Sequence, residues 1–299
     1  MSSDGDDLTV RHAVYDVDAD KFYIILASHP NVLHQVSRAS LRSKWKTKAG
    51  VELTFLTKHD RHRNFLSLSM DSTTRLLYAC SNFGDVEGDI AVYLVRHDNA
   101  ELVATIKSSI RPSYSAVNFA TPQQLFYMYS SSAMFGSKDN DDADIKEISL
   151  LAIGSVLDNT VELYAMDFNS FASKIEQNYE SGGVAFNTSQ ASIKQGFKKI
   201  ATVAQWNRTG TDQPGSVYGP RELYFDPAGR LIVADEYNFR FQLFAMTGDQ
   251  QNLMSPVFVS EETGWQLWST AIVMPDATTG RITALATKYN DVLAYEFDE

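Results

Sequence analysis

A short unit of two apolar segments joined by a polar turn recurs along the chain, and this repetition constrains the fold more than any other feature. In its clearest copy, residues 219–244, one apolar segment ends at Asp226, a turn follows, and a second segment ends at Asp235. Copies with the same order occupy residues 14–26, 68–79, 117–129 and 272–285. Short apolar runs bounded by Asp, Asn, Gly and Pro indicate β-strands joined by tight turns.

A third apolar segment follows several of these copies, at residues 90–96, 161–167, 241–247 and 292–298. The turn aspartates lie about 50 residues apart, or about twice that, which is typical of four-stranded propeller blades. They are Asp16, Asp71, Asp226 and Asp276, with Phe119 or Ala120 as a degenerate member. The double interval before Asp226 leaves room for another blade, expected to begin near residues 182–187. The sequence therefore predicts an all-β fold, a single propeller over residues 1–299 with six blades, while five or seven stay open.

Two further features of this propeller are expected. Only three strands fit after Asp276, so the missing outer strand of the last blade is expected from residues 8–11, which would close the ring and remove an exposed sheet edge. Residues 131–159 are expected to form an acidic loop insertion. The insertion lacks the central Gly and the distal Glu of a calcium loop, so it is interpreted as a solvated loop and not as a metal site.

The clearest copy resembles an NHL repeat. The matching residues are Pro220, Asp226, Gly229, Val233, Ala234, Asp235, Asn238, Arg240 and Phe244. The resemblance implies a propeller fold, with Asp235, Asn238 and Arg240 binding loop backbone, and implies little about chemistry because such propellers host unrelated functions. One position departs from the pattern: Glu222 stands where the repeat has Gly.

Composition excludes several classes of partner. The formal net charge is −11, and nucleic-acid binding normally needs a basic face. No run of 18 or more apolar residues occurs, so no membrane span is expected. Cys80 is the only cysteine, which excludes an internal disulfide and a Cys-x-x-Cys metal or redox pair. A single cysteine favours the cytoplasm over secretion, although a removed leader stays open.

Candidate site residues follow from the place where propellers of this kind bind ligands, the mouth of the central channel. The loops expected there carry many aromatic side chains, a composition typical of a small-molecule pocket. The residues expected to bind substrate are Arg111, Tyr114, Arg221, Tyr237, Trp265 and Trp268. Those expected to be catalytic are Glu222, His62 and Tyr218. The alternatives are packing between blades for the aromatics, a solvated basic loop for His62, and an ion pair with Arg221 or Arg230 for Glu222.

The sequence favours a metal-independent propeller that binds a mostly apolar small molecule. A cyclase or isomerase, as found on propellers in natural-product biosynthesis, would fit, because positioning and polarisation suffice there without a cofactor. A non-catalytic propeller that binds a protein partner is the alternative. A calcium-dependent lactonase or hydrolase is a second alternative. It is less favoured because the first-blade Glu of that type is missing: no Glu precedes Glu52.

Overall fold

The computed structural model describes most of the strands and the turns that join them. The described residues are 9–47, 53–58, 64–72, 74–83, 86–97, 99–108, 110–118, 148–167, 184–187, 197–207, 213–226, 228–247, 253–260, 269–270, 274–275, 282–288 and 291–297. All statements below on what is absent refer to these residues.

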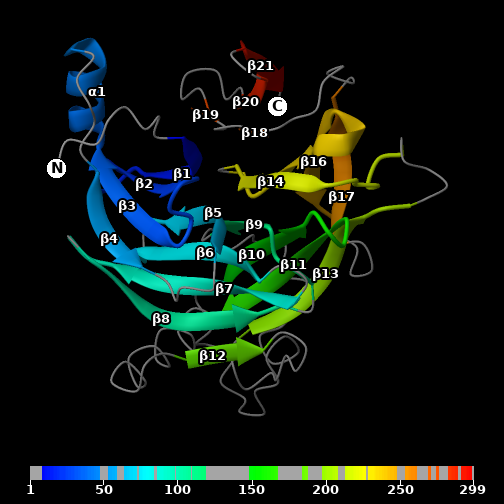
Figure 1. The fold of residues 1–299 in the computed structure, drawn as a ribbon. Coiled ribbons are helices and arrows are strands. Elements are labelled where there is room, and N and C mark those ends of the chain that lie inside the picture. Colours follow the sequence, from blue (N-terminus) through cyan, green and yellow to red (C-terminus); the bar gives the residue numbers. More distant parts are fainter. Residues whose placement is uncertain are drawn as a thin grey trace.

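Four antiparallel sheets form propeller blades (Figure 1). The first contains β1 (Val10–Asp16), β2 (Lys21–Leu26), β3 (Val32–Ser37) and β4 (Thr54–Lys58). The second contains β5 (Asn64–Asp71), β6 (Leu76–Phe83), β7 (Val86–Val95) and β8 (Ala100–Lys107). The third contains β9 (Tyr114–Asn118), β10 (Ile148–Ser155), β11 (Thr160–Asp167) and β13 (Phe197–Gln205). The fourth contains β14 (Pro220–Phe225), β15 (Leu231–Asp235), β16 (Arg240–Met246) and β17 (Met254–Val259).

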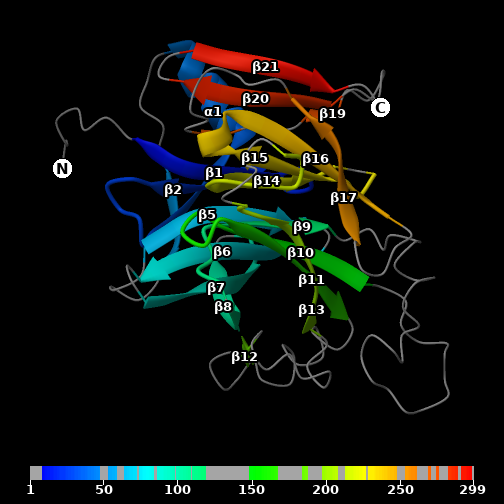
Figure 2. The ribbon, with the colours of Figure 1, turned by 90° about the vertical axis from the view of Figure 1, so that its right-hand side faces the viewer.

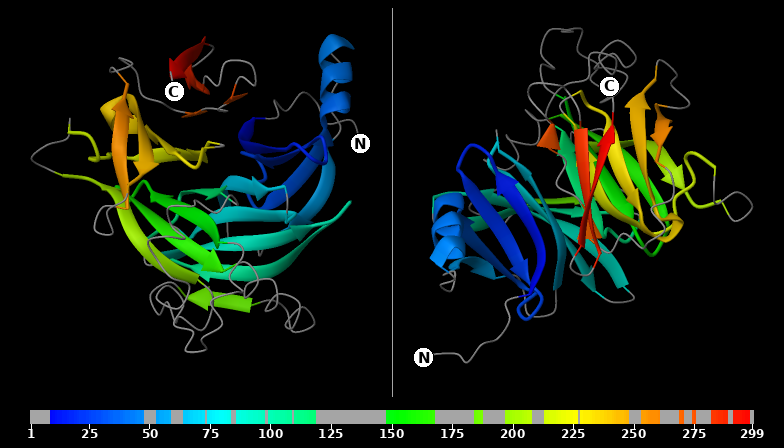
Figure 3. Two further views of the ribbon diagram at one scale, coloured as in Figure 1. Left: turned by 180° about the vertical axis from the view of Figure 1, so that it is seen from behind. Right: turned by 90° about the horizontal axis from the view of Figure 1, so that it is seen from above.

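A fifth, smaller sheet contains β18 (Ser269–Thr270), β19 (Met274–Pro275), β20 (Ile282–Lys288) and β21 (Asp291–Phe297). Both β18 and β19 pair with β20, which pairs in turn with β21. Two views show this sheet between the first and the fourth blade (Figures 1 and 3). The all-β propeller is therefore confirmed. The described residues also contain one α-helix of ten residues, α1 (Arg38–Thr47), between β3 and β4, and a short 3-10 helix, η3 (Glu236–Asn238), between β15 and β16.

The turn aspartates do what their position predicts. In the first blade, Asp16 accepts hydrogen bonds from the backbone N–H groups of Asp18 and Ala19, both at 3.2 Å. In the fourth, Asp226 accepts the N–H of Arg230 at 2.7 Å, and Gly229 has a φ of 78°. A short carboxylate bonded to turn amides, followed by a residue with positive φ, stabilises a tight hairpin.

The expected count of six blades is not found: the described residues form four blades and the smaller sheet. The additional blade was expected to begin near residues 182–187, but β12 (Val184–Asn187) pairs in parallel with β8 as the outermost strand of the second blade (Figure 2). Closure of the ring by the N-terminal strand is not confirmed either. Of that strand, Val10 and Arg11 belong to β1, which pairs with β2 as the first strand of the first blade.

The boundaries expected for the acidic insertion, 131–159, were also wrong. Ile148–Ser155 is strand β10, paired with β9 on one side and β11 on the other. Its apolar side chains Leu150, Leu151 and Ile153 are fully buried, so this part of the segment belongs to the core of the third blade. The remainder of the expected insertion, 131–147, lies outside the described residues.

The core lies between neighbouring blades. One apolar cluster joins the third and fourth blades and includes Leu150, Leu163, Leu223 and Phe244. The first strands of successive blades lie side by side, β1 against β5, β5 against β9, and β9 against β14. Side chains from four blades therefore meet at the centre. No helix in the described part of the chain is long and apolar enough to cross a membrane.

Candidate functional site

A hydrogen-bonded pair of side chains joins the first and fourth blades at the centre of the propeller. His12 on β1 and Glu222 on β14 are 210 positions apart in the sequence, yet His12 Nε2 lies 3.2 Å from both carboxylate oxygens of Glu222. The two side chains are 13% and 16% exposed, respectively. They are thus shielded from most of the solvent while a part of each can still be reached. We call His12 and Glu222 the central pair.

The backbone of the second blade fixes the tautomer of His12. The N–H of Leu68 on β5 donates a hydrogen bond to His12 Nδ1 at 3.2 Å. A nitrogen that accepts a hydrogen bond carries no proton, so the proton of neutral imidazole must be on Nε2, which donates it to Glu222. The result is a carboxylate oriented by an N–H group and held at the place where three blades meet.

Beside the central pair lies a second set of polar groups. The ring centroids of Tyr114 on β9 and His12 are 6.2 Å apart. Burial raises the pKa of the Tyr114 phenol, and a hydrogen bond from Arg221 opposes this shift. Arg221 Nη1 also donates to Glu236 Oε1 at 2.8 Å. Burial raises the pKa of Glu236, and the charge of Arg221 opposes that rise. Because the pKa of Tyr114 is raised above its ordinary value, its phenol remains a neutral hydrogen-bond donor at physiological pH.

Three aromatic rings continue from this set toward the solvent. Trp206 and Tyr218 are stacked, with centroids 5.3 Å apart and an interplanar angle of 15°. Tyr218 and Tyr237 are 4.8 Å apart with a tilt of 45°. Tyr218 is 37% exposed and Tyr237 is 39% exposed. We call Trp206, Tyr218 and Tyr237 the aromatic stack. Tyr237 also interacts electrostatically with Arg221, which links the stack to the polar set.

Five residues expected at the site lie in this continuous group. They are Tyr114, Tyr218, Arg221, Glu222 and Tyr237. Glu222 was considered as a partner of Arg221 or Arg230; in the structure it pairs with His12, Arg221 pairs with Glu236, and Arg230 pairs with Asp226. Arg111 instead forms an ion pair with Asp158, at 2.6 Å, in the turn between β10 and β11. His62, Trp265 and Trp268 lie outside the described residues.

His12, Glu236 and Trp206 also belong to this group but were not expected there from the sequence. A signal for His12 existed in the repeat itself: His12 and Glu222 are each the third residue of the first strand of a blade. Aligning the copies strand by strand would have placed these two side chains at the same position along the first strand of their blades. The pairing of residues from the first and fourth blades could not be predicted without the geometry of the ring.

Among the described residues we find neither an activated cysteine nor a cluster of metal ligands. Cys80 is fully buried on β6, and burial raises the pKa of its thiol to about 11, so little thiolate exists at neutral pH to act as a nucleophile. No group of three or more His, Cys, Asp or Glu side chains in the described ranges is arranged to hold a metal ion.

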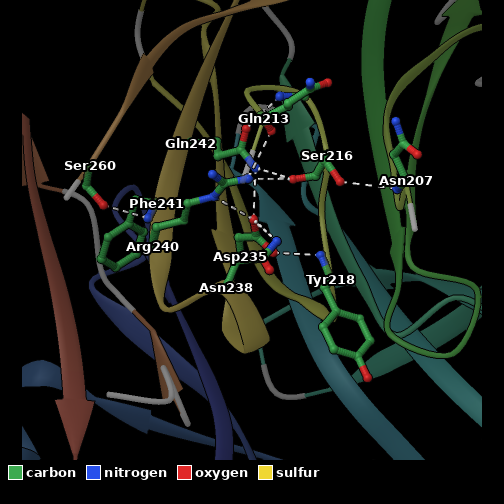
Figure 4. A network of polar contacts seen from close by, with 11 residues as sticks. Asn207, Gln213, Ser216, Tyr218, Asp235, Asn238, Arg240, Phe241, Gln242 and Ser260 are labelled. Carbon is green, nitrogen blue, oxygen red and sulfur yellow. Dashed lines mark hydrogen bonds and ion pairs between the residues drawn. The ribbon is translucent and has the colours of Figure 1, made fainter. Parts of the chain in front are cut away.

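A buried polar network holds the loops next to the site (Figure 4). Asp235 accepts hydrogen bonds from the Tyr218 N–H at 2.7 Å and from the side chains of Asn238, Arg240 and Gln242 at 2.8, 3.0 and 2.9 Å. Arg240 in turn donates to the carbonyls of Gln213 and Ser216. The network thus ties the loop that carries Tyr218 to β15 and β16.

Replacing Gly219 with alanine should disturb the aromatic stack. Gly219 has a φ of +70°, and an added Cβ would lie 2.4 Å from the Tyr237 ring. Gly215 is a matched control, because its φ is +84° but its nearest neighbour, in Pro256, is 3.8 Å away. Left-handed backbone should cost either variant about 1–2 kcal/mol of unfolding free energy. Only Gly219→Ala should also change the near-UV circular dichroism of the stacked rings. Identical spectra for the two variants would contradict the packing of Tyr237 on Gly219.

Comparisons with known proteins identify the fold alone. No protein-family model matches the chain, and no curated protein matches it. Solved structures do resemble it. One is a protein of unknown function from Bacteroides caccae, with a TM-score of 0.50 and 9% sequence identity over 98% of this chain and 79% of that one. This likeness supports a β-propeller arrangement and carries no information on function.

Proposed function

We propose that this protein binds a small molecule at the centre of the propeller and transfers protons on it, as an isomerase or a cyclase does, without a metal or another cofactor. The observation that supports this most is the central pair. A carboxylate oriented by a histidine N–H, partly shielded from water and flanked by a buried phenol, has the composition of a general acid–base site.

Each group then has a role in the proposed reaction. Glu222 would accept a proton from the substrate through the lone pairs that His12 leaves free. Tyr114 and Arg221 would donate hydrogen bonds to an oxygen on which negative charge develops. Tyr218 and Tyr237 would contact the apolar face of the substrate. Tyr218, expected from the sequence to be catalytic, is thus better suited to binding.

A thermal-shift screen with a library of small cyclic ketones, alcohols and lactones tests this proposal. A ligand at 100 times its dissociation constant stabilises the folded state by about 2.7 kcal/mol. For a chain of this size, such a gain raises Tm by about 5 °C. Stabilisation by a library member that Glu222→Ala reduces would support a central small-molecule site. Stabilisation that persists unchanged in Glu222→Ala, which lacks the side-chain contact, would place the ligand elsewhere and contradict the proposal.

The alternative, a propeller that binds a protein partner, has one observation in its favour. Val257 and Phe258 on β17, the outermost strand of the fourth blade, are 58% and 41% exposed. Exposed apolar side chains on an outer strand are a feature of protein interaction sites. Protein that co-purifies with the wild type but not with Val257→Ser/Phe258→Ser, together with no stabilising small molecule in the screen, would favour this alternative.

The finer description of the fold is also a proposal. The fifth sheet has three strand positions, a broken first strand of β18 and β19 followed by β20 and β21, and β18 lies beside β14 of the fourth blade. We propose that it is the last blade of a five-bladed ring. The NHL-like character of residues 219–244 belongs to the same proposal and rests on their sequence and on the turn at Asp226.

A further inference from the structure

We infer that the ligand of this site is a neutral ring rich in hydroxyl groups, a carbohydrate residue. This inference rests on the proposed function and refines its substrate class: the substrate would have an apolar C–H face but a polar edge. Three features of the described site support it: the presence of charges of both signs, an oxygen that needs a partner, and the exposed tyrosine rings.

The site carries charges of both signs, the guanidinium of Arg221 and the carboxylates of Glu222 and Glu236. Arg221 lies beside Glu236, with Nη1 and Oε1 2.8 Å apart, and His12 directs its Nε2–H at Glu222. A cationic ligand would meet the guanidinium of Arg221, and an anionic ligand would meet the carboxylates of Glu222 and Glu236. Since a like charge close by is unfavourable in a partly desolvated site, a neutral ligand with hydrogen-bonding groups fits best.

One oxygen of Glu236 needs a hydrogen-bond partner. The side chain is 5% exposed, and its Oε2 is buried with no partner among the described atoms. An unsatisfied buried acceptor costs about 1–3 kcal/mol, so a small polar group enclosed by the site would stabilise it. A hydroxyl group both donates and accepts. It can therefore satisfy Glu236 whether the carboxyl group is ionised or protonated.

The aromatic stack supplies the complementary apolar surface. Tyr218 and Tyr237 combine rings that are more than one third exposed with phenolic hydroxyl groups. A sugar ring presents C–H bonds on its faces and hydroxyl groups at its edge. With its face against Tyr237, its edge would lie toward the pair of Arg221 and Glu236, because Arg221 interacts with Tyr237 as well as with Glu236. A saturated hydrocarbon ring could use the tyrosines but would leave the polar groups without partners.

Saturation-transfer NMR on the full chain tests this inference. The probes are methyl glycosides of glucose, galactose, mannose, xylose and N-acetylglucosamine, with cyclohexanol and tetramethylammonium as comparisons. We expect at least one glycoside to bind, with the strongest transfer to the C–H protons of one ring face. Tyr237→Ala should weaken that binding about tenfold, the upper range for one aromatic contact. Glu236→Gln should also weaken it, whereas Glu101→Gln, an exposed change of the same kind on β8, should not.

The outcomes separate this inference from the proposed function. Since Tyr237→Ala could alter the fold of its loop, Tyr237→Phe, which keeps the ring, should retain glycoside binding within about twofold. Failure of every glycoside to bind would overturn the inference, as would equal binding of cyclohexanol or preferential binding of tetramethylammonium. If a ligand without hydroxyl groups binds and Glu222→Ala abolishes its binding, the proposed function stands while this inference falls. If a glycoside binds, Glu222→Ala leaves its binding unaltered and no turnover is seen, this inference stands while the proposed function falls.

Discussion

Asp235→Ala should lower the free energy of unfolding by about 3–5 kcal/mol, the usual cost of removing one partner from a buried ion pair. Asp235 is fully buried, and its carboxylate accepts four hydrogen bonds, two of them from Arg240 and Gln242. Without it, the guanidinium of Arg240, whose side chain is 6% exposed, would lose its counter-charge but could not reach water.

Urea unfolding of Asp235→Ala and Asp235→Asn measures this effect. The asparagine variant keeps the shape and part of the hydrogen bonding, so its loss should be smaller, about 1–3 kcal/mol. Asp18→Ala is the control, because Asp18 lies exposed in the turn after β1 and such a change should alter stability by less than about 0.5 kcal/mol. A loss below about 1 kcal/mol for Asp235→Ala would contradict the view that this network holds the fourth blade together.

Glu222→Gln should lower the turnover of a substrate found by the screen by a factor of about 10² to 10⁴, the usual contribution of a general acid–base group. Glutamine keeps the size of the side chain and can still accept the hydrogen bond from His12 Nε2, but it is not a base. We therefore expect kcat to fall much more than KM rises, because the lost interaction belongs to the transition state.

Two controls accompany this measurement. Glu101→Gln removes the same charge from a surface pair, in which Glu101 lies 3.7 Å from Arg96, and should leave turnover unchanged. Glu222→Asp keeps the carboxylate but withdraws it from His12, so it should retain a measurable part of the activity. Full activity of Glu222→Gln would show that the central pair is structural and that the chemistry occurs elsewhere.

Much of the fold was predictable because local rules decide it. Turn aspartates such as Asp16 and Asp226, each between two apolar runs, marked hairpins that the structure contains. The blade count was not predictable by the same rules. Spacing alone cannot tell a blade from a long connection, and the short run Val184–Asn187 joins β8 as an added edge strand. The pattern of apolar residues is the same in a strand that begins a new blade and in a strand added to the edge of another blade, so only the strand pairing distinguishes the two.

The site was partly predictable for a related reason. Glu222 could be singled out because it replaces a Gly of the repeat, and Tyr114, Arg221 and Tyr237 because they lie near the start of a blade or in the loop between its second and third strands. Partners were harder to predict. Arg221 lies one residue from Glu222 in the chain but pairs with Glu236, since neighbouring side chains on a strand point to opposite faces. The partner of Glu222 comes from the other end of the sequence, where only the ring brings it close.

The central claim is that His12 and Glu222 form an oriented pair at a ligand site. Nitrogen-15 NMR of the His12 ring, recorded with and without a ligand from the screen, tests it most directly. We predict an unprotonated Nδ1 and a protonated Nε2 in the free protein, and a ligand that shifts the Nε2 resonance while Nδ1 keeps its bond to Leu68. Rapid averaging of the two tautomers, or a ring that no stabilising ligand affects, would contradict the claim.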